Sequence, residues 1–537
     1  MVLDITETTS RNGQVVFLFG VKLVLHNPTC IHFEAATQKN WGRYGEHASH
    51  SLVWNWHVYS NFLPLATVFL PLLVTFRSIT LRMYKSYHFM NPNILHCKSV
   101  RGVVMPKITF LGAGSTVFAK NVLGDCMHVS ALEGSEFALY DIDPQRLKDS
   151  ESMLNNLKES TGREVTVKAY TDRKEALRGA KYVINAVQIG GYDPCTITDF
   201  EIPKRYGLQQ TIADTVGIGG IFRNLRTIPV LLDFARDMEE VCPNAWFLNY
   251  TNPMAALTGT LLRFGGIKAV GLCHSVQVCA PYLLKSLGME TDNLQYKIAG
   301  INHMAWLLEI TRDGVDLYPE IKRRAAEKQK ARHDDMVRFE LMLRFGYYVT
   351  ESSEHNAEYH PYFIKGRYPE LIERFHIPLD EYPRRCVEQI NKWTAMREDL
   401  VNNKQISHAR TLEYASYIIE AMETNKPFTI GGNVLNTGRL ISNLPEKACV
   451  EVPCLVDGNG VTPTYVGELP EQLAALNRTN INTQLLTIEA AITRKKEHIY
   501  HAALLDPHTA SELSIDDIVS LCDDLIEAHG EWLPQFS

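Results

Sequence analysis

From Lys107 onward, short runs of apolar residues alternate with helical stretches along the chain. This alternation predicts parallel strands joined by crossover helices, the pattern of a Rossmann-like doubly wound α/β sheet. We expect strands at residues 107–111, 136–140, 181–187, 246–248 and 269–272. All but the second run directly into a polar turn containing Gly or Asn, which is where a doubly wound sheet binds its ligands.

The pattern changes near residue 300, where longer helices and extended, aromatic-rich loops begin. We therefore expect a first domain at residues 105–300 and a second, α+β domain at residues 301–537 that closes over the first. No internal repeat or low-complexity segment is visible.

Residues 1–104 differ from the rest, because no helical or strand periodicity is sustained in them. The apolar run at residues 62–76 contains two prolines and is 15 residues long, whereas a membrane-spanning helix needs about 20. The segment also lacks the basic start and small-residue cleavage site of a secretory signal. Because a clean strand follows Met105 at once, we expect residues 1–104 to be an appended extension outside the mature protein. A targeting or anchoring segment is the alternative.

Composition and charge narrow the function. The 537 residues, 45% hydrophobic and 21% charged, are enough to bury at least two sizeable cores. A formal net charge of -7 argues against a nucleic-acid binder and favours a small-molecule partner. The 11 cysteines show no disulfide framework, which predicts reduced thiols and a cytoplasmic location. Cys449 and Cys454 have no second pair at metal-finger spacing, so a zinc finger is not expected.

A glycine-rich turn follows the first predicted strand, in the segment ITFLGAGSTVF at residues 108–118. Gly112 and Gly114 allow a tight turn with a bare backbone, and a helix starts at Ser115, where free N–H groups and the helix dipole favour a phosphate. Val117 replaces the third glycine of the usual dinucleotide motif. Taken alone, the match also fits a structural turn.

The second predicted strand ends in YDID, which supplies two carboxylates. Asp141 is placed to accept hydrogen bonds from a ribose diol, which favours NAD over NADP. Asp143 is assigned to cap the helix that begins near Pro144. The predicted NAD-binding residues are Gly112, Gly114, Ser115 and Asp141.

Polar clusters end four further strands, at residues 188–192, 211–220, 249–253 and 271–275, and a fifth cluster opens the second domain at 300–304. Cys273 and His303 stand in two of these clusters. A thiolate and an imidazole can bind one divalent ion and leave positions open for substrate oxygens. The thiolate suits zinc or iron, whereas hydroxyl oxygens suit a harder ion such as manganese, so these residues leave the metal open.

Taken together, the motifs resemble glycoside hydrolase family 4, and within it the α-galactosidases that act on melibiose-type sugars. The resemblance covers residues 105–537 and leaves residues 1–104 without a counterpart. It rests on LGAGS, QIGGY, ADT followed by three glycines, NYTNPMA, GLCHS, GINHMA, ESSEH and CVEV, in the order that the family shows. Any one motif is a weak signal, but the ordered set is specific.

The resemblance implies NAD⁺ in the first domain and a divalent cation, usually Mn²⁺, held by Cys273 and His303. It implies that Asn252, in the NP motif, contacts the sugar. His274, which follows the metal cysteine, takes the position of the proton donor to the glycosidic oxygen. Related phospho-glycosidases have Asp at this position, and the His is typical of the galactosidase branch.

The base that removes the proton on carbon 2 is a tyrosine in several members of the family. Tyr359, in ESSEHNAEYHPYF, is the candidate here, with His355 and Glu354 as alternatives. The implied reaction oxidises carbon 3, eliminates the leaving sugar, adds water and returns the hydride. NAD is then needed but not consumed, and no pair of carboxylates is required.

Two other functions stay open on the sequence. A net dehydrogenase of the lactate or malate type, acting on a hydroxy acid or a sugar, would share the nucleotide-binding sheet. A non-catalytic NAD-binding or sugar-sensing module needs fewer polar strand ends and no thiolate-imidazole pair. The expected partner is an α-galactoside, without nucleic acid or membrane, and the expected assembly is a homo-oligomer, either dimer or tetramer.

Overall fold

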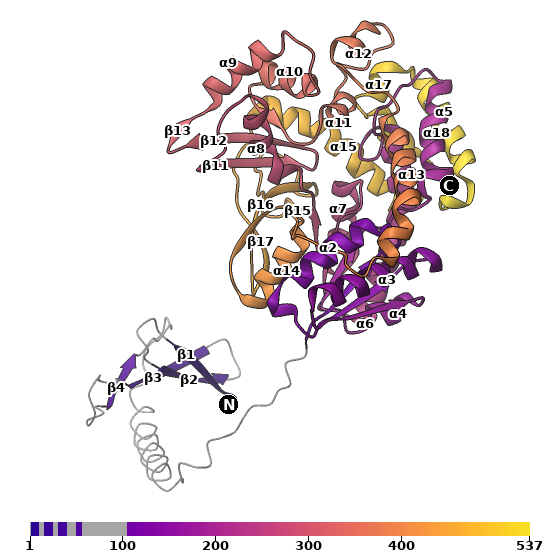
Figure 1. The fold of residues 1–537 in the computed structure, drawn as a ribbon. Coiled ribbons are helices and arrows are strands. Elements are labelled where there is room, and N and C mark those ends of the chain that lie inside the picture. The colour runs from indigo at the N-terminus through magenta and orange to yellow at the C-terminus, as the bar shows by residue number, and fades with distance from the viewer. Residues whose placement is uncertain (1, 10–14, 25–29, 40–49, 56–104) are drawn as a thin grey trace. The chain divides into compact units, whose positions relative to one another are not determined.

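The computed structural model describes residues 2–9, 15–24, 30–39, 50–55 and 105–537. The chain divides into two compact units, Met1–Arg101 and Gly102–Ser537 (Figure 1). The apolar run at residues 62–76 lies outside the described residues. Within the described part, no helix is long and apolar enough to cross a membrane.

The described residues of the first unit form four strands that pair as one antiparallel sheet in chain order. The sequence shows no sustained periodicity in these segments, and none of them was predicted as a strand. Their strand structure depends on pairing between segments, such as Val2 with Lys22, which periodicity within one segment does not reveal. The strands are β1 (Val2–Thr9), β2 (Val15–Val24), β3 (Cys30–Lys39) and β4 (His50–Asn55).

The second unit is built on parallel strands in the order β7-β6-β5-β8-β9-β10. Counted along the chain, this is the 3-2-1-4-5-6 order of a doubly wound dinucleotide-binding sheet, which confirms the predicted fold class. The strands are β5 (Lys107–Leu111), β6 (Glu136–Tyr140), β7 (Thr166–Tyr170), β8 (Tyr182–Asn185), β9 (Trp246–Asn249) and β10 (Lys268–Leu272). The helices are α2 (Val117–Met127), α3 (Pro144–Thr161), α4 (Arg173–Leu177), α5 (Ile197–Arg205), α6 (Gly217–Val241), α7 (Met254–Phe264) and α8 (Ser275–Ser286).

The first two strands have the predicted bounds, and β9 and β10 are each one residue longer than predicted. Two larger differences concern β8 and β7. The strand expected at residues 181–187 ends at Asn185, because the chain turns there toward the polar cluster at 188–192. Strand β7 was not predicted. It lies at the edge of the sheet, and its five side chains are exposed or half-buried, so it carries no apolar run.

Antiparallel strands extend the sheet past β10, in the order β15-β16-β11-β12-β13, with β14 beside β12 and β17 beside β16. The two predicted domains therefore share one continuous sheet. In Figure 1, β11 to β13 lie beside α9 (Tyr318–Lys328) and α10 (Met336–Phe345). The strands are β11 (Leu294–Ile301), β12 (Met304–Arg312), β13 (Val315–Asp316), β14 (Tyr348–Val349), β15 (Phe428–Leu435), β16 (Cys449–Asp457) and β17 (Gly460–Pro463).

The helices that follow β13 pack on both halves of this unit, with α13 (Glu381–Asn402) against α3, α18 (Ile515–His529) against α5 and α15 (Glu471–Thr493) beside β11. The side chain of Asn477 on α15 donates to the carbonyl oxygen of Met304 at 2.7 Å and accepts the indole N–H of the fully buried Trp306 at 3.3 Å. These bonds hold α15 against the start of β12. The helices are α9 (Tyr318–Lys328), α10 (Met336–Phe345), α11 (Ser353–Glu358), α12 (Glu370–Arg374), α13 (Glu381–Asn402), α14 (Tyr414–Thr424), α15 (Glu471–Thr493), α16 (Lys496–Leu504), α17 (Thr509–Glu512) and α18 (Ile515–His529).

The cysteines from Cys126 to Cys522 are free thiols. Cys449 and Cys454 lie in β16 and pair across the sheet with Leu435 and Ile430 of β15. Both thiols are buried and belong to the core.

Candidate active site

The turn between β5 and α2 requires glycine at two positions. Gly112 has φ +86°, and a Cβ there would lie 2.8 Å from the carbonyl oxygen of Ala186. A Cβ at Gly114 would lie 2.7 Å from a carboxylate oxygen of Asp141. The Ser115 hydroxyl oxygen is buried and has no hydrogen-bond partner among the described residues, so it is free for a ligand oxygen.

Asp141 connects the end of β6 to this glycine turn. Its Oδ2 accepts the N–H of Gly114 at 2.6 Å, and its Oδ1 accepts the N–H of Asp143 at 3.0 Å. Asp143 accepts the N–H groups of Gln145 at 2.9 Å and Arg146 at 3.1 Å, so it caps α3 as the sequence predicts. The two carboxylates thus have separate structural roles, and Asp141 is the one beside the turn.

Cys273, His303 and Glu351 come together from three loops. Cys273 follows β10, His303 lies in the turn from β11 to β12, and Glu351 follows β14. One ligand atom of each lies within 4.8 Å of the others, and Nε2 of His303 is 3.4 Å from Oε2 of Glu351. His303 and Glu351 both have φ +64°, an unusual backbone for residues other than glycine. Such strain is typical of residues held for a function.

The three groups differ in charge. Burial, and then the charges of Glu451 and Glu351, raise the pKa of the Cys273 thiol well above its usual value. Burial also lowers the pKa of His303, although Glu351 opposes this effect. Burial alone would raise the pKa of Glu351, but the charges of His303, His355 and His274 outweigh it and lower that pKa to about 2. The cluster therefore offers a thiol, a neutral imidazole and a carboxylate. A divalent ion would bind the imidazole and the carboxylate directly and the sulfur as a thiolate, with release of the thiol proton.

The second ring nitrogen of His303 faces two hydroxyl groups. Its Nδ1 lies 3.1 Å from the hydroxyl oxygen of Tyr359 and 3.2 Å from that of Thr215. Thr215 in turn donates to Oδ1 of Asp214 at 2.8 Å. Contacts of this kind at one nitrogen orient the ring and leave the other, Nε2, free to bind a metal. Tyr359 is fully buried, and burial raises the pKa of its hydroxyl well above the usual value.

The two alternative bases differ in their surroundings. His355 is buried, and its ring centre lies 5.1 Å from that of His303. Its Nδ1 is 3.6 Å from Oε1 of Glu351, so it faces the same cluster. Glu354 instead forms an ion pair with Arg385 of α13. Of the alternatives, His355 is the one that joins the cluster.

Asn252 lies after β9, and His274 lies beside Cys273 after β10. The side-chain oxygen of Asn252 is buried without a hydrogen-bond partner in the described residues. His274 is exposed directly before α8 and adjoins Cys273 in the chain. A buried acceptor without a partner and an exposed imidazole are both available to a ligand.

Residues 107–289 match the family 4 glycosyl hydrolases, and residues 298–509 match the C-terminal domain of the same family. Together the two matches cover most of the chain. The chain belongs to family 4 of the glycosyl hydrolases.

Two curated relatives of this family 4 chain are α-galactosidases. The one from Bacillus subtilis (strain 168) is 71% identical over 432 residues, which are 80% of this chain and 100% of the relative. The one from Rhizobium meliloti (strain 1021) is 34% identical over 442 residues, 80% of this chain and 90% of the relative.

Solved structures share the family 4 fold. The putative glucosidase lplD from Bacillus subtilis matches with a TM-score of 0.72 and 27% identity, over 78% of this chain and 99% of its own. A 6-phospho-α-glucosidase from gut microorganisms, solved with NAD and Mn²⁺, matches with a TM-score of 0.66 over 81% of this chain and 100% of its own. At 21% identity the latter supports the fold alone.

Sequence reasoning missed Glu351, although it is the first residue of the quoted ESSEH motif. It also missed Glu358, whose carboxylate accepts the N–H groups of Thr211 at 2.9 Å and Ala213 at 2.7 Å. These bonds hold the loop that carries Thr215 toward His303. Both glutamates lie within a predicted motif, so the signal was present, but only the folded chain shows what each carboxylate contacts.

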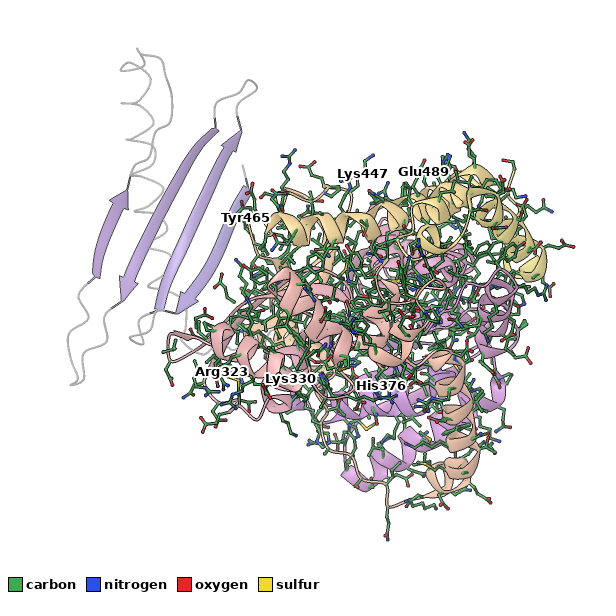
Figure 2. The ribbon with its side chains drawn as sticks, turned by 90° about the horizontal axis from the view of Figure 1, so that it is seen from above. Arg323, Lys330, His376, Lys447, Tyr465 and Glu489 are labelled. Atoms are coloured by element: carbon green, nitrogen blue, oxygen red, sulfur yellow. The ribbon has the colours of Figure 1, made fainter. Side chains whose placement is uncertain are left out.

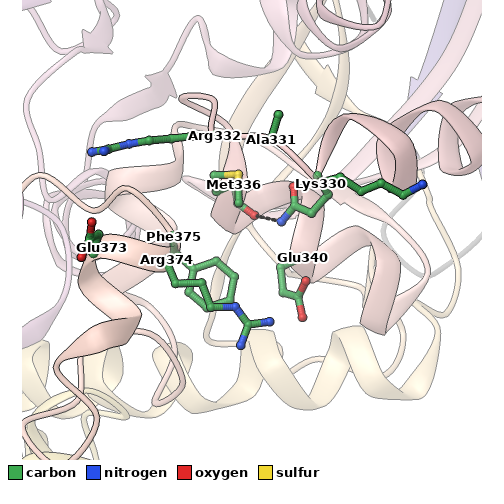
Figure 3. A pocket seen from close by; sticks show the side chains of 9 residues that line it. Lys330, Ala331, Arg332, Met336, Glu340, Glu373, Arg374 and Phe375 are labelled. Carbon is green, nitrogen blue, oxygen red and sulfur yellow. Dashed lines mark hydrogen bonds between the residues drawn. The ribbon is translucent and has the colours of Figure 1, made fainter.

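A separate surface pocket of about 330 Å³ lies between the end of α9, the start of α10 and α12 (Figure 3). Its charged side chains include Lys330, Arg332 and Glu373. Figure 2 shows Lys330 at the outer surface, where 72% of its side chain is exposed. None of the predicted site residues lines this pocket.

Proposed function

We propose that this chain is an NAD⁺- and divalent-metal-dependent α-galactosidase that hydrolyses terminal α-galactosides of the melibiose or raffinose type. The observation that carries the proposal is the cluster of Cys273, His303 and Glu351 at the loops of a doubly wound sheet. The 71% identity with an α-galactosidase of Bacillus subtilis supports the substrate class.

The glycine turn fits a bound dinucleotide. Gly112 and Gly114 keep side chains away from the backbone that a pyrophosphate would approach, and Ser115 has an unpartnered hydroxyl oxygen. Asp141, already bonded to the Gly114 N–H, has carboxylate oxygens at the end of β6, where a ribose diol is bound in sheets of this order. These four residues would hold NAD⁺.

The Cys273 cluster fits a divalent metal. Glu351 adds a hard carboxylate to the soft thiolate and the imidazole, and this mixed set suits Mn²⁺ better than the two predicted ligands alone. When bound, NAD⁺ accepts a hydride from carbon 3 and the metal polarises the sugar oxygens as a Lewis acid, so that the proton on carbon 2 becomes acidic. We assign Cys273, His303 and Glu351 as the protein ligands.

The chain supplies the proton transfers and the sugar contact. Tyr359, beside Nδ1 of His303, is proposed as the base for carbon 2, with His355 as the second candidate. His274 is proposed as the proton donor to the leaving sugar, since it is exposed and adjoins the metal cysteine. Asn252 is proposed to bind the galactosyl hydroxyls with its unpartnered oxygen.

The test is hydrolysis of 4-nitrophenyl α-galactoside by dialysed protein, with NAD⁺, Mn²⁺ and a reductant added singly and together. Activity is expected only with all three, because Cys273 must be in its reduced form to bind the metal as a thiolate. Hydrolysis in deuterated water should also place deuterium on carbon 2 of the released galactose. Full activity in EDTA without nucleotide would contradict the proposal.

The release of 4-nitrophenol also distinguishes a glycosidase from a net dehydrogenase. NADH would accumulate with a hydroxy acid or sugar, and no 4-nitrophenol would be released. Membership of family 4 favours hydrolysis over that outcome. The homo-oligomer and the cytoplasmic location stay predictions.

A further inference from the structure

Four residues lie in one row across adjacent strands of the sheet. Gly271 of β10 pairs with Asn433 of β15, Asn433 pairs with Glu451 of β16, and Glu451 pairs with Gly300 of β11. The row begins two residues before Cys273 and ends three residues before His303. It therefore joins the two strands that lead into the predicted metal ligands.

The middle of the row is a buried polar pair. The Asn433 side-chain N–H group donates to Oε1 of Glu451 at 2.9 Å and to the carbonyl oxygen of Gly271 at 3.3 Å. Asn433 is 0% exposed and Glu451 1%. A buried polar pair is costly unless it is bonded, and apolar residues would pack in the same space. Packing alone therefore gives no reason for Asn and Glu at these positions.

A glycine stands at each end of the row. A Cβ at Gly271 would lie 2.8 Å from Cβ of Asn433, so glycine lets β10 approach the pair closely. A Cβ at Gly300 would lie 2.7 Å from Cα of Ala305, so glycine there lets β11 approach β12. On the β10 side, the close approach to Asn433 leaves little room for another side chain.

The row also bears on the geometry of the cluster. Three interstrand spacings of about 4.8 Å would separate β10 from β11 by about 14 Å at the row. The ligand atoms of Cys273 and His303 nevertheless lie within 4.8 Å of each other. The loops after the two strands converge, and a change in the row would move the point where they meet.

Glu451 and the cluster also influence each other through charge. Burial, and then the charge of Glu451, raise the pKa of the Cys273 thiol. Burial raises the pKa of Glu451 itself, the hydrogen bond from Asn433 opposes this effect, and the charge of Glu351 adds to it.

We propose that Asn433 and Glu451 are positioning residues that fix the separation of Cys273 and His303 before a metal binds. This inference rests on the proposed metal site. Neither residue belongs to the group of Cys273, His303 and Glu351, so each would act through the strand that carries a ligand. Supporting residues of this kind typically change metal affinity by 10–100-fold when removed.

The test is titration of the full chain with Co²⁺ under reducing conditions. The thiolate-to-cobalt charge-transfer absorption band measures how much Co²⁺ is bound. Asn433→Ala and Glu451→Ala should weaken Co²⁺ binding by 10–100-fold and leave NAD⁺ affinity within about threefold. Glu451→Gln keeps the acceptor oxygen and should stay within about threefold of the parent. Asn433→Ser, whose smaller cavity can hold water, replaces Asn433→Ala if the latter does not fold.

Asn436→Ala is the matched control. Asn436 follows β15 and is as buried as Asn433, but its side chain bonds the carbonyl oxygens of Ile441 and Leu444. It should lower stability without changing Co²⁺ affinity in the folded protein. Parent-like affinity in both alanine variants, or an equal loss in Asn436→Ala, would overturn the inference. Absence of the absorption band in the parent would overturn the metal site itself, and the inference with it.

Discussion

The hydroxyl oxygen of Tyr359 lies 3.1 Å from Nδ1 of His303, and Nε2 of the same ring faces Glu351 at 3.4 Å. The imidazole of His303, itself a predicted metal ligand, therefore lies between the predicted base and Glu351. A divalent cation at Nε2 would place positive charge near the tyrosine hydroxyl, which favours its ionised form against the effect of burial.

Tyr359→Phe tests this arrangement. The variant should lower kcat by at least 100-fold, because a positioned base typically contributes 10²–10⁴-fold. Deuterium exchange at carbon 2 should slow by a similar factor. Thr215→Val removes the other hydroxyl beside Nδ1 and should lower kcat by less than tenfold. Unchanged exchange in Tyr359→Phe would transfer the role to His355.

Asp141 and Asp143 provide a matched pair for the nucleotide site. Asp141→Ala should weaken NAD⁺ binding by at least tenfold, because it removes both the carboxylate for the ribose and the acceptor that holds Gly114. Asp143→Ala should cost about 1 kcal/mol of stability as a lost helix cap, with NAD⁺ affinity unchanged. Calorimetric titration and urea unfolding measure the two effects. Equal NAD⁺ affinity in both variants would remove Asp141 from the site.

The sequence predicted those parts of the site that follow strands directly. Cys273 follows β10 at once, and Asp141 follows β6, because the carboxyl ends of parallel strands meet at one edge of the sheet. Glu351 follows β14, a strand of two residues that has no periodicity to detect. Its place beside His303 depends on the fold of the whole second half of the chain.

The sheet order was predictable only in part. The parallel strands alternate with helices and can therefore be predicted from the sequence, apart from the exposed edge strand β7. Strands β15 and β16 lie between β10 and β11 although they follow both in the chain. The quoted CVEV motif contains Glu451, but no local pattern tells that this residue pairs with Gly300. Non-local pairing is decided by packing, which a single sequence does not display.

Glu351→Gln tests the ligand that the structure adds. Replacing the carboxylate by an amide should weaken Mn²⁺ binding by at least tenfold, because a hard anionic oxygen is lost. Cys273→Ser and His303→Ala should each abolish activity and leave NAD⁺ binding largely intact. Glu354→Gln is the control, since its carboxylate is paired with Arg385. Mn²⁺ affinity equal to the parent in Glu351→Gln would remove it from the ligand set.

Glu451→Gln should change how stability depends on pH. Burial raises the pKa of Glu451 to about 8, whereas an unfolded glutamate titrates near pH 4.3. Between these values the unfolded chain releases the proton and the folded chain retains it. The free energy of unfolding therefore falls as pH rises through this range, and the fall ends near pH 8.

The amide introduced by Glu451→Gln cannot titrate, so the unfolding free energy of this variant minus that of the parent should increase from pH 5 to pH 8 and then stay level. A shift of one pKa unit corresponds to about 1.4 kcal/mol, and solvent relaxation around Glu451 would reduce the measured increase. We expect at least about 1 kcal/mol across this range. Urea unfolding in EDTA without NAD⁺ measures this increase free of ligand effects.

Other buried groups near Glu451, including Cys273, Cys449 and Tyr414, are present in both proteins, and their contributions largely cancel in the difference. Glu446→Gln, at an exposed position, controls for the loss of a carboxylate and should give a level difference. A level difference for Glu451→Gln as well would show that Glu451 is ionised in the folded protein at neutral pH.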